Sequence, residues 1–260
     1  MKIKILYIFF LCFTFSVWYF FLPNRIQENK LIDIAYSFIN YPYQANSIKC
    51  KSNEYVPTYK EIKNFDCVTF VETVLAQYET QQNLFNQDFQ KSLQKIRYKN
   101  AINSCENRNH FFVLDLIKNN PAYNITNISQ KISCNHKITS KKVTINKSEW
   151  FKENHNINIK KNIEYLTIDY IKSGDFTTIN FNNLKNLLPT ISLMAIIGQD
   201  KNIDVNHVGF LIKKQNKIVF LHASYVQKKV IEENIFNYLS KIKKNKTLLG
   251  IAVFQISHKN

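Results

Sequence analysis

Cys67 has the surroundings of a catalytic thiol. The segment Phe65-Asp66-Cys67-Val68-Thr69-Phe70-Val71 opens an amphipathic stretch that predicts a helix from Cys67 to about Glu79, with Asp66 as its N-cap. The unpaired N–H groups and the dipole of a helix start favour an anion. We therefore expect a thiolate-prone sulfur and an oxyanion hole formed by the same N–H groups. A structural core cysteine is the alternative, because Cys67 lies on the inward face of this helix.

Two downstream runs that are typical of strands each carry a histidine, His207 and His222. A tight hairpin around Lys214-Gln215 would place His207 directly opposite His222 on one sheet face, with Cβ atoms about 5 Å apart. His207 would then be the general base for Cys67, and His222 would fix its tautomer. Gly209 leaves this face open for the helix start to approach. Two unrelated strand histidines are the alternative.

The chain offers little support for a metal or another cofactor, and we expect none. The histidines lack a third ligand at short spacing, and no pair of cysteines has the CxxC spacing of a zinc site. With only four glycines the chain has no phosphate-binding loop. In an exported protein, two of Cys50, Cys105 and Cys134 can form a disulfide, and the sequence does not decide which.

The net charge of +16 favours a polyanionic partner such as an acidic cell wall. Basic residues form no dense block and no aromatic-basic pattern, so we expect no nucleic-acid binding.

Residues 1–25 predict a signal peptide or a membrane anchor. Lys2 and Lys4 precede an apolar run, Ile5–Leu22, that is long enough to span a bilayer. No small-x-small cleavage site follows, so a cleaved signal and an uncleaved anchor both stay open. Either one exports the body of the chain. We expect a periplasmic or cell-envelope protein, held at the inner membrane if the segment stays uncleaved.

Residues 26–260 predict one α+β domain in which the Cys67 helix packs on a central antiparallel sheet. We expect the polar stretch 122–160 to be a variable peripheral insertion with short strands, and 181–205 to be a long connection or a flap near the site. The other expected elements are helices over 31–40, 84–96, 108–119 and 232–242 and strands over 176–179 and 249–256.

These motifs resemble those of the NlpC/P60 superfamily of papain-like cysteine peptidases and amidases. Asp66-Cys67 followed by Phe70-Val71 is similar to the superfamily's Asp-Cys-Ser-Gly-Phe-Val. The histidine runs are similar to its His-Val-Gly and His-Ala strands. The DUF1460 branch, described as N-acetylmuramoyl-L-alanine amidase-like, is a closer match over about residues 30–256. Its likeness rests on Pro42-Tyr43, Asp66–Glu72, Ile96-Arg97-Tyr98, Arg108-Asn109-His110-Phe111 and Ser173-Gly174-Asp175.

The resemblance implies a papain-like fold and a hydrolase of peptidoglycan. It assigns the nucleophile to Cys67, the base to His207, the orienting residue to His222, and substrate binding to Tyr43, Asp66 and Arg108. The bond it favours joins N-acetylmuramic acid to L-alanine. Cleavage between D-glutamate and the diamino acid of the stem peptide is the alternative. Val68-Thr69 replaces the superfamily's Ser-Gly, so we do not transfer the superfamily's recognition of the peptide end to this chain. A non-catalytic basic wall-binding protein and an acyltransferase also stay open. We expect a monomer.

Overall fold

The computed structural model describes residues 23–82, 88–120 and 122–258. The apolar run predicted as a signal or anchor, within residues 1–22, lies outside these ranges. Among the described helices, none is both long and apolar enough to cross a membrane.

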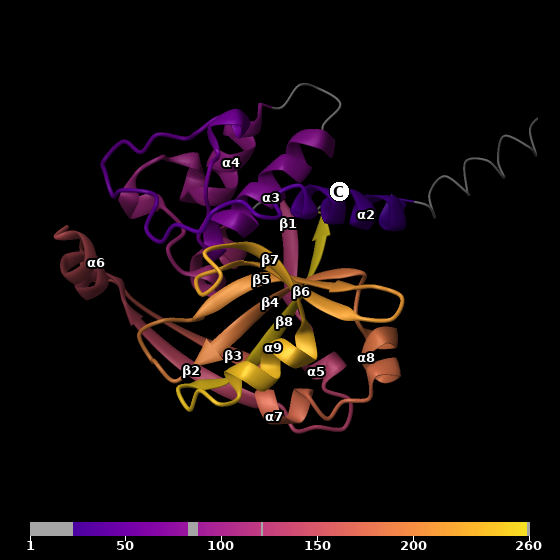
Figure 1. Cartoon of the computed structure of the whole chain (residues 1–260). Coiled ribbons are helices and arrows are strands. Elements are labelled where there is room, and N and C mark those ends of the chain that lie inside the picture. Colours follow the sequence, from indigo (N-terminus) through magenta and orange to yellow (C-terminus); the bar gives the residue numbers. More distant parts are fainter. Residues whose placement is uncertain (1–22, 83–87, 121, 259–260) are drawn as a thin grey trace, which may run out of the picture.

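The N-terminal part of the described chain is helical up to residue 117, and strands follow from Tyr123 with short helices between some of them (Figure 1). In chain order the elements are α2 (Pro23–Tyr36), η1 (Tyr59–Glu61), α3 (Cys67–Gln82), α4 (Phe89–Arg97), η2 (Lys99–Ala101), η3 (Cys105–Asn107), the π-helical η4 (Phe112–Ile117), β1 (Tyr123–Asn127), α5 (Ser129–Ile132), β2 (Thr139–Asn146), α6 (Lys147–His155), β3 (Ile163–Lys172), α7 (Ser173–Phe176), α8 (Phe181–Leu187), β4 (Ile191–Gly198), β5 (His207–Lys213), β6 (Ile218–Ser224), β7 (Lys229–Asn234), α9 (Ile235–Ile242) and β8 (Leu248–His258).

Within the described ranges, eight strands form one antiparallel sheet through the middle of the molecule. Their order is β2-β3-β8-β4-β5-β6-β7, and β1 also pairs with β8. Every residue of β4 and of β6 is buried. Their near-continuous apolar sequences fit strands that are covered on both faces. The prediction of an antiparallel sheet is confirmed.

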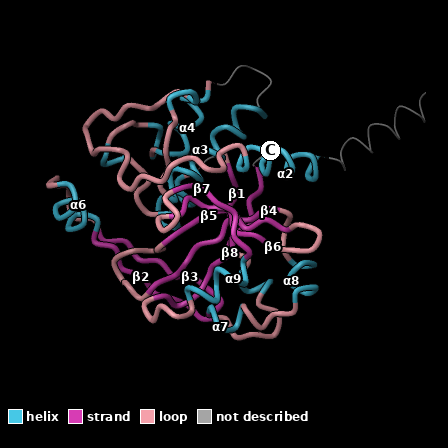
Figure 2. Tube along the Cα trace, viewed as in Figure 1, coloured by secondary structure: helices cyan, strands magenta, loops and turns pink. Residues whose placement is uncertain are grey.

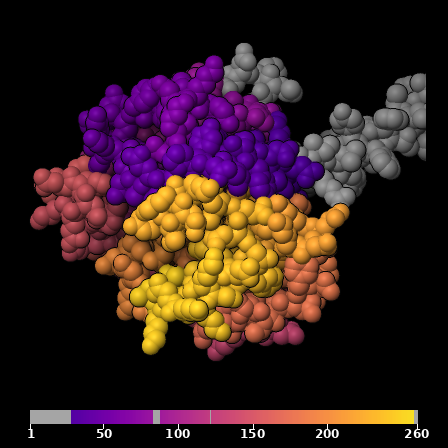
Figure 3. All heavy atoms as spheres, viewed as in Figure 1, coloured from indigo at the N-terminus to yellow at the C-terminus, as the bar shows by residue number. Residues whose placement is uncertain are grey.

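Helices cover both faces of this sheet, and each face has its own hydrophobic core. Helices α2 and α3 pack on one face, with α4 against α3, while α5, α7, α8 and α9 lie on the other (Figure 1 and Figure 2). The aromatic rings of Phe70 on α3 and Phe210 on β5 meet edge to face, with centroids 5.6 Å apart. This contact holds the helix that begins at Cys67 against the sheet, as predicted. In a space-filling view the N-terminal part of the chain rests directly on the C-terminal part (Figure 3).

The segment 181–205 does not form the predicted connection or flap. It contains α8 and the central strand β4, which pairs with β5 on one side and β8 on the other. Met194, Ala195 and Ile197 are fully buried. A short apolar run without alternation is typical of such a two-sided strand, and this signal decides against a flap.

Two further predicted elements have different boundaries. The predicted strand 176–179 is wrong: helix α7 precedes it, and Phe176 fills the second core from that helix. The predicted helix over 232–242 begins only at Ile235, because the side chain of Asn234 accepts hydrogen bonds from the N–H groups of Phe236 and Asn237 at 3.0 and 3.3 Å. Residues 229–234 are therefore free to form β7 beside β6.

The stretch 122–160, predicted as an insertion with short strands, contributes two strands to the sheet. β1 pairs with β8, and β2 pairs with β3. Helix α6 follows β2 and projects from the end of the β2–β3 hairpin (Figure 1). Its residues reach the cavity described below.

Candidate active site

Asp66 caps the helix that begins at Cys67, as the sequence predicts. One carboxylate oxygen of Asp66 accepts hydrogen bonds from the N–H groups of Val68 and Thr69, at 3.1 and 2.8 Å. The N–H of Asp66 donates in return to the Thr69 hydroxyl at 2.9 Å. This reciprocal cap fixes where the helix starts and holds Cys67 in its first turn. It also occupies two of the N–H groups expected for the oxyanion hole.

The Cys67 sulfur lies beside the start of β5. The N–H of Val208 is directed at it, as are those of Cys67 and Val68, and all three lower the pKa of the thiol. Burial has a larger and opposite effect, reinforced by the nearby Asp66 carboxylate, and raises this pKa to about 12. The expectation of a thiolate-prone sulfur is therefore wrong for the resting state. A neutral thiol needs a base to become a nucleophile.

The two histidines meet, but in a different register from the predicted one. Lys213 pairs with Ile218, and the turn is Gln215-Asn216. The register is two positions away from the predicted one, which keeps both histidines on the same face. His207 consequently reaches His222 diagonally across the strands, with Nε2 of His207 2.7 Å from Nδ1 of His222.

Gly209 makes this diagonal contact possible. A Cβ at position 209 would lie 2.7 Å from Cβ of His222 and from the Leu221 carbonyl oxygen. The predicted open space beside the base is thus filled by His222 itself.

We expect Gly209→Ala to displace His222 and to lower both stability and hydrolysis, because the added methyl group has no room. Overpacking of this kind costs about 1–3 kcal/mol. Thermal unfolding and hydrolysis rates measure the two effects. Gly174→Ala is the matched control, since the nearest side-chain atom to a Cβ there is 3.7 Å away. Equal effects of the two substitutions would contradict the steric argument.

Glu233 on β7 extends the pair of histidines to a chain of three side chains. Nε2 of His222 lies 3.2 Å from a carboxylate oxygen of Glu233. Phe220 stacks on the His222 ring at 4.4 Å between centroids, and Tyr238 of α9 meets it edge to face. Glu233 is not among the predicted site residues, because its segment was predicted to be part of a helix. The signal that could have found it is Asn234, whose capping role places Glu233 before the helix.

The charge of Glu233 determines which ring nitrogens of His222 and His207 carry a proton. The hydrogen bond from His222, with Lys241 in support, lowers the pKa of Glu233 to about 2, so its carboxylate accepts from Nε2–H of His222. A ring with one proton then presents a bare Nδ1, which accepts from Nε2–H of His207. The bare nitrogen of His207 is therefore Nδ1. Burial lowers the pKa of His207 to about 3, which keeps its ring neutral and able to accept a proton.

Glu233→Gln should reduce kcat/KM at least about tenfold, because an amide cannot hold His222 in the same tautomer as well as a carboxylate does. The Glu233 charge also raises the pKa of His207. Its loss should move the acid limb of the pH profile to lower pH, which a purely structural defect would not do. Glu232→Gln is the control: this neighbour binds Lys214 and Lys217 at 2.7 and 2.5 Å instead of a histidine. A rate unchanged by Glu233→Gln would remove Glu233 from the site.

A cavity of about 600 Å³ opens at the Cys67 helix start. Cys67 and all three residues predicted to bind substrate, Tyr43, Asp66 and Arg108, line it. Among the described residues that line the cavity, neither His207 nor His222 is found. Loop, helix α3 and helix α6 residues share the lining, and a volume of this size suits a small-molecule or peptide fragment.

Tyr43 and Arg108 differ in how free they are to bind a ligand. The Tyr43 ring packs edge to face against Tyr225 at 5.7 Å, and burial together with Cys67 and Asp66 raises the pKa of its hydroxyl. Arg108 already has protein partners, because Nη1 lies 3.3 Å from the Glu54 carboxylate and donates to the Ile48 carbonyl at 3.1 Å. The predicted carboxylate clamp at Arg108 would have to share its guanidinium with Glu54.

Asp204 connects the loop before His207 to η4, the element that follows the cavity-lining residues 108–110. Its buried carboxylate accepts from the N–H groups of Val113 and Leu114, at 2.5 and 3.1 Å, in the first turn of η4. Its other oxygen accepts from Val205 N–H at 2.7 Å. The residues that follow Arg108 and those that precede His207 are thereby held together.

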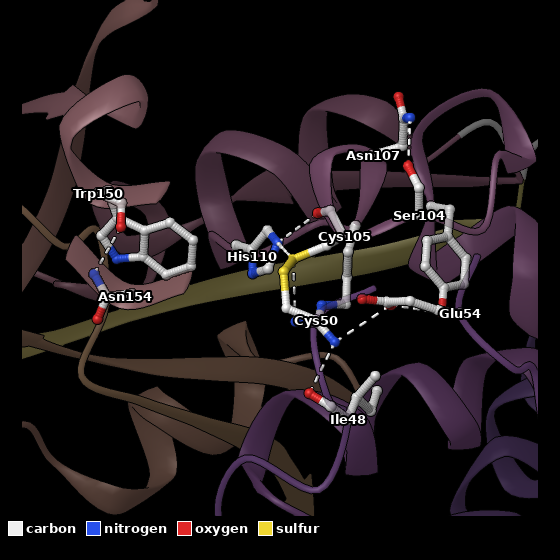
Figure 4. The surroundings of a disulfide bond; sticks show 11 residues. Ile48, Cys50, Glu54, Ser104, Cys105, Asn107, His110, Trp150 and Asn154 are labelled. Carbon is white, nitrogen blue, oxygen red and sulfur yellow. Dashed lines mark hydrogen bonds and ion pairs between the residues drawn. A yellow bond between two sulfur atoms is a disulfide. The ribbon is translucent and has the colours of Figure 1, made fainter. Parts of the chain in front are cut away.

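The predicted disulfide joins Cys50 to Cys105, and Cys134 is left as a free thiol. The bridge lies in the wall of the same cavity, where the ring of His110 is directed at it (Figure 4).

Residues 33–249 match a family model named AmiA-like, described as N-acetylmuramoyl-L-alanine amidase-like. A DUF1460 protein from Legionella pneumophila has a similar structure, with a TM-score of 0.75 and 24% identity over 90% of each chain. An N-acetylmuramoyl-L-alanine amidase from Bacteroides uniformis matches with a TM-score of 0.67 and 21% identity, over 89% of this chain and 99% of that one. At such identities the likeness shows a common fold. No curated protein matches this chain at a significant level.

Proposed function

The chain belongs to the AmiA-like family of N-acetylmuramoyl-L-alanine amidase-like proteins, and on this premise we propose that it is a cysteine hydrolase of peptidoglycan. The bond it cleaves is the amide between N-acetylmuramic acid and L-alanine. One observation carries the proposal: the contacts from Glu233 through His222 end at His207, and the N–H of the next residue, Val208, is directed at the Cys67 sulfur in the cavity wall. We assign Cys67 as the nucleophile, His207 as the base, and His222 with Glu233 as the orienting group, which are the roles of a catalytic triad. We extend the proposal to a papain-like mechanism of the NlpC/P60 type.

In the first half of the reaction, Nδ1 of His207 takes the thiol proton as the Cys67 sulfur attacks the lactyl carbonyl carbon of muramic acid. We assign the oxyanion hole to the N–H groups of Val208 and Cys67, which point at the sulfur. The imidazolium of His207 then gives its proton to the nitrogen of L-alanine. The C–N bond breaks and leaves a thioester on Cys67.

In the second half, His207 deprotonates a water molecule that attacks the thioester. The muramic acid carboxylate leaves and the thiol regains its proton. His222 and Glu233 keep the His207 ring in the tautomer that both steps need. Because Cys67 and His207 both start neutral, proton transfer accompanies attack rather than preceding it as a stored ion pair.

The wall substrate places the proposed activity in the cell envelope. The charge of +16 favours retention on an anionic wall.

Mass spectrometry of products from defined muropeptides tests the reaction. Wild-type protein should release free disaccharide and a peptide that begins with L-alanine. A disaccharide that keeps the dipeptide L-Ala-D-Glu would indicate the endopeptidase reaction instead. Binding to sacculi without any released fragment would contradict hydrolysis and favour a wall-binding protein.

A further inference from the structure

Four side chains that could ligate a metal meet in the cavity wall, next to the proposed catalytic site but apart from it. The sulfur atoms of Cys50 and Cys105 and one ring nitrogen of His155 all lie within 4.8 Å of one another. Nε2 of His110 lies 3.8 Å from the Cys105 sulfur. The His110 and His155 rings are 5.4 Å apart between centroids.

We propose that this cluster, once its disulfide is reduced, is a zinc site with the ligands Cys50, Cys105, His155 and His110. Two thiolates and two imidazoles are a complete tetrahedral ligand set for Zn²⁺. The inference goes beyond the proposed hydrolysis and does not depend on it. The sequence has no CxxC spacing that would indicate this site, because the four ligands come from separate segments. Cys50 lies in the loop after α2, Cys105 in η3, His110 shortly before η4, and His155 at the end of α6.

The surroundings of His155 support its role as a metal ligand, which it does not fill while the disulfide is intact. Nε2 of His155 is buried and has no hydrogen-bond partner among the described residues. A buried polar nitrogen without a partner is costly, so such a group calls for an explanation. A metal ion bound to Nε2 would supply this missing partner.

His110 already points toward the bridge (Figure 4). Its Nε2 now donates to the Cys105 carbonyl oxygen at 2.7 Å; to bind zinc, the ring would give up this bond and change tautomer, with its one proton on Nδ1. Trp150 packs over both imidazoles, with ring centroids 4.7 Å from His110 and 5.0 Å from His155. This apolar cover would limit access of water to the bound ion.

The disulfide is replaced by a zinc site in two steps, reduction and metal binding. A dithiol transfers two electrons and two protons to the Cys50–Cys105 bond, which breaks to two thiols while the dithiol becomes a disulfide. Zn²⁺ then replaces the two thiol protons. The disulfide joins two segments of the cavity wall, whereas zinc would join four and would fix the end of α6 beside the cavity.

The test uses full-length protein with Cys12→Ser, Cys67→Ser and Cys134→Ser, so that Cys50 and Cys105 are the only thiols left. After reduction and removal of the reductant, we expect one Zn²⁺ bound per chain by elemental analysis, and none in the oxidised protein. Co²⁺ in place of Zn²⁺ should give the thiolate-to-metal absorption of a tetrahedral site. Bound zinc should also protect both thiols from alkylation.

Single substitutions distinguish the site from unspecific binding. His155→Ala should weaken zinc binding by more than the roughly 10- to 100-fold that loss of an outer-shell partner costs. His110→Ala should do the same, and Cys105→Ser should abolish binding. His136→Ala, at a histidine that contacts Thr178 far along the chain, should change nothing. A reduced protein that binds no zinc, or an affinity unchanged by His155→Ala, would overturn the proposal.

Discussion

Cys67→Ala should lower the rate of muropeptide hydrolysis at least about 10³-fold, the largest effect of any substitution that we expect. The thiol supplies the bond-forming atom, and among the described residues Cys50 is the other cysteine that lines the cavity, where its sulfur is held in the disulfide. The free enzyme should still fold, because alanine fits the first turn of α3 and Asp66 keeps its cap. Product release, followed by chromatography and mass spectrometry, measures the rate.

Cys134→Ser is the matched control for this substitution. Cys134 is the other free cysteine within the described residues, and it packs at the edge of the second core, away from the cavity. Its loss should leave hydrolysis close to the wild-type rate. If Cys67→Ala digests sacculi as fast as the wild type, the nucleophile assignment is wrong.

His207→Ala should be the next most damaging change, with a loss of about 10²- to 10⁴-fold in kcat/KM. The pKa of the Cys67 thiol is about 12, so almost no thiolate exists near neutral pH unless a base removes the proton. Raising the pH should partly restore the variant, because hydroxide can then generate the thiolate. His136→Ala should keep full activity. A His207→Ala rate that stays near wild type at neutral pH would show that another base acts.

The pH profile of the wild type follows from the same residue. The pKa of His207 is lowered to about 3, so the base loses its function only as the pH falls toward that value rather than near 6.5. We expect kcat/KM to stay level between about pH 5 and pH 8.

The same lowered pKa of His207 makes folding stability depend on pH. Between about pH 6.5 and pH 3 the unfolded state binds more protons than the folded state, so the free energy of unfolding declines as the pH falls through this range. Circular dichroism at each pH separates this unfolding from protonation of the base. An activity lost with an apparent pKa near 6.5 in a folded protein would contradict the burial of His207.

The parts of the site that sequence reasoning could predict are those fixed by local rules. Asp66 caps α3 because a side chain three residues from a free N–H can reach it, and that requires no knowledge of the fold. The two histidines share a face because a strand alternates with a period of two. Their register was wrong by two positions, since turn position depends on which cross-strand pairs fit, and Gly209 allows a closer neighbour than the sequence suggests.

The parts that could not be predicted depend on tertiary contacts. Glu233 reaches His222 only because β7 pairs with β6, and its segment has too weak an alternation to identify a strand. The helix dipole suggested a thiolate at Cys67, yet burial outweighs it, and burial is a property of the packed molecule. The choice of Cys50 and Cys105 for the disulfide likewise requires that two distant loops meet.

The hydrogen bonds between the Asp204 carboxylate and η4 have a consequence for chimeras made between relatives. This carboxylate serves N–H groups that lie 90 and 91 residues away in the chain. A chimera that imports only the pocket-forming stretch before β1 would present a foreign backbone to this carboxylate, and a shift of that backbone would leave the buried oxygen that now binds Val113 and Leu114 without its donors. Transplanting substrate preference between these proteins thus calls for exchanging both stretches at once, as a single unit.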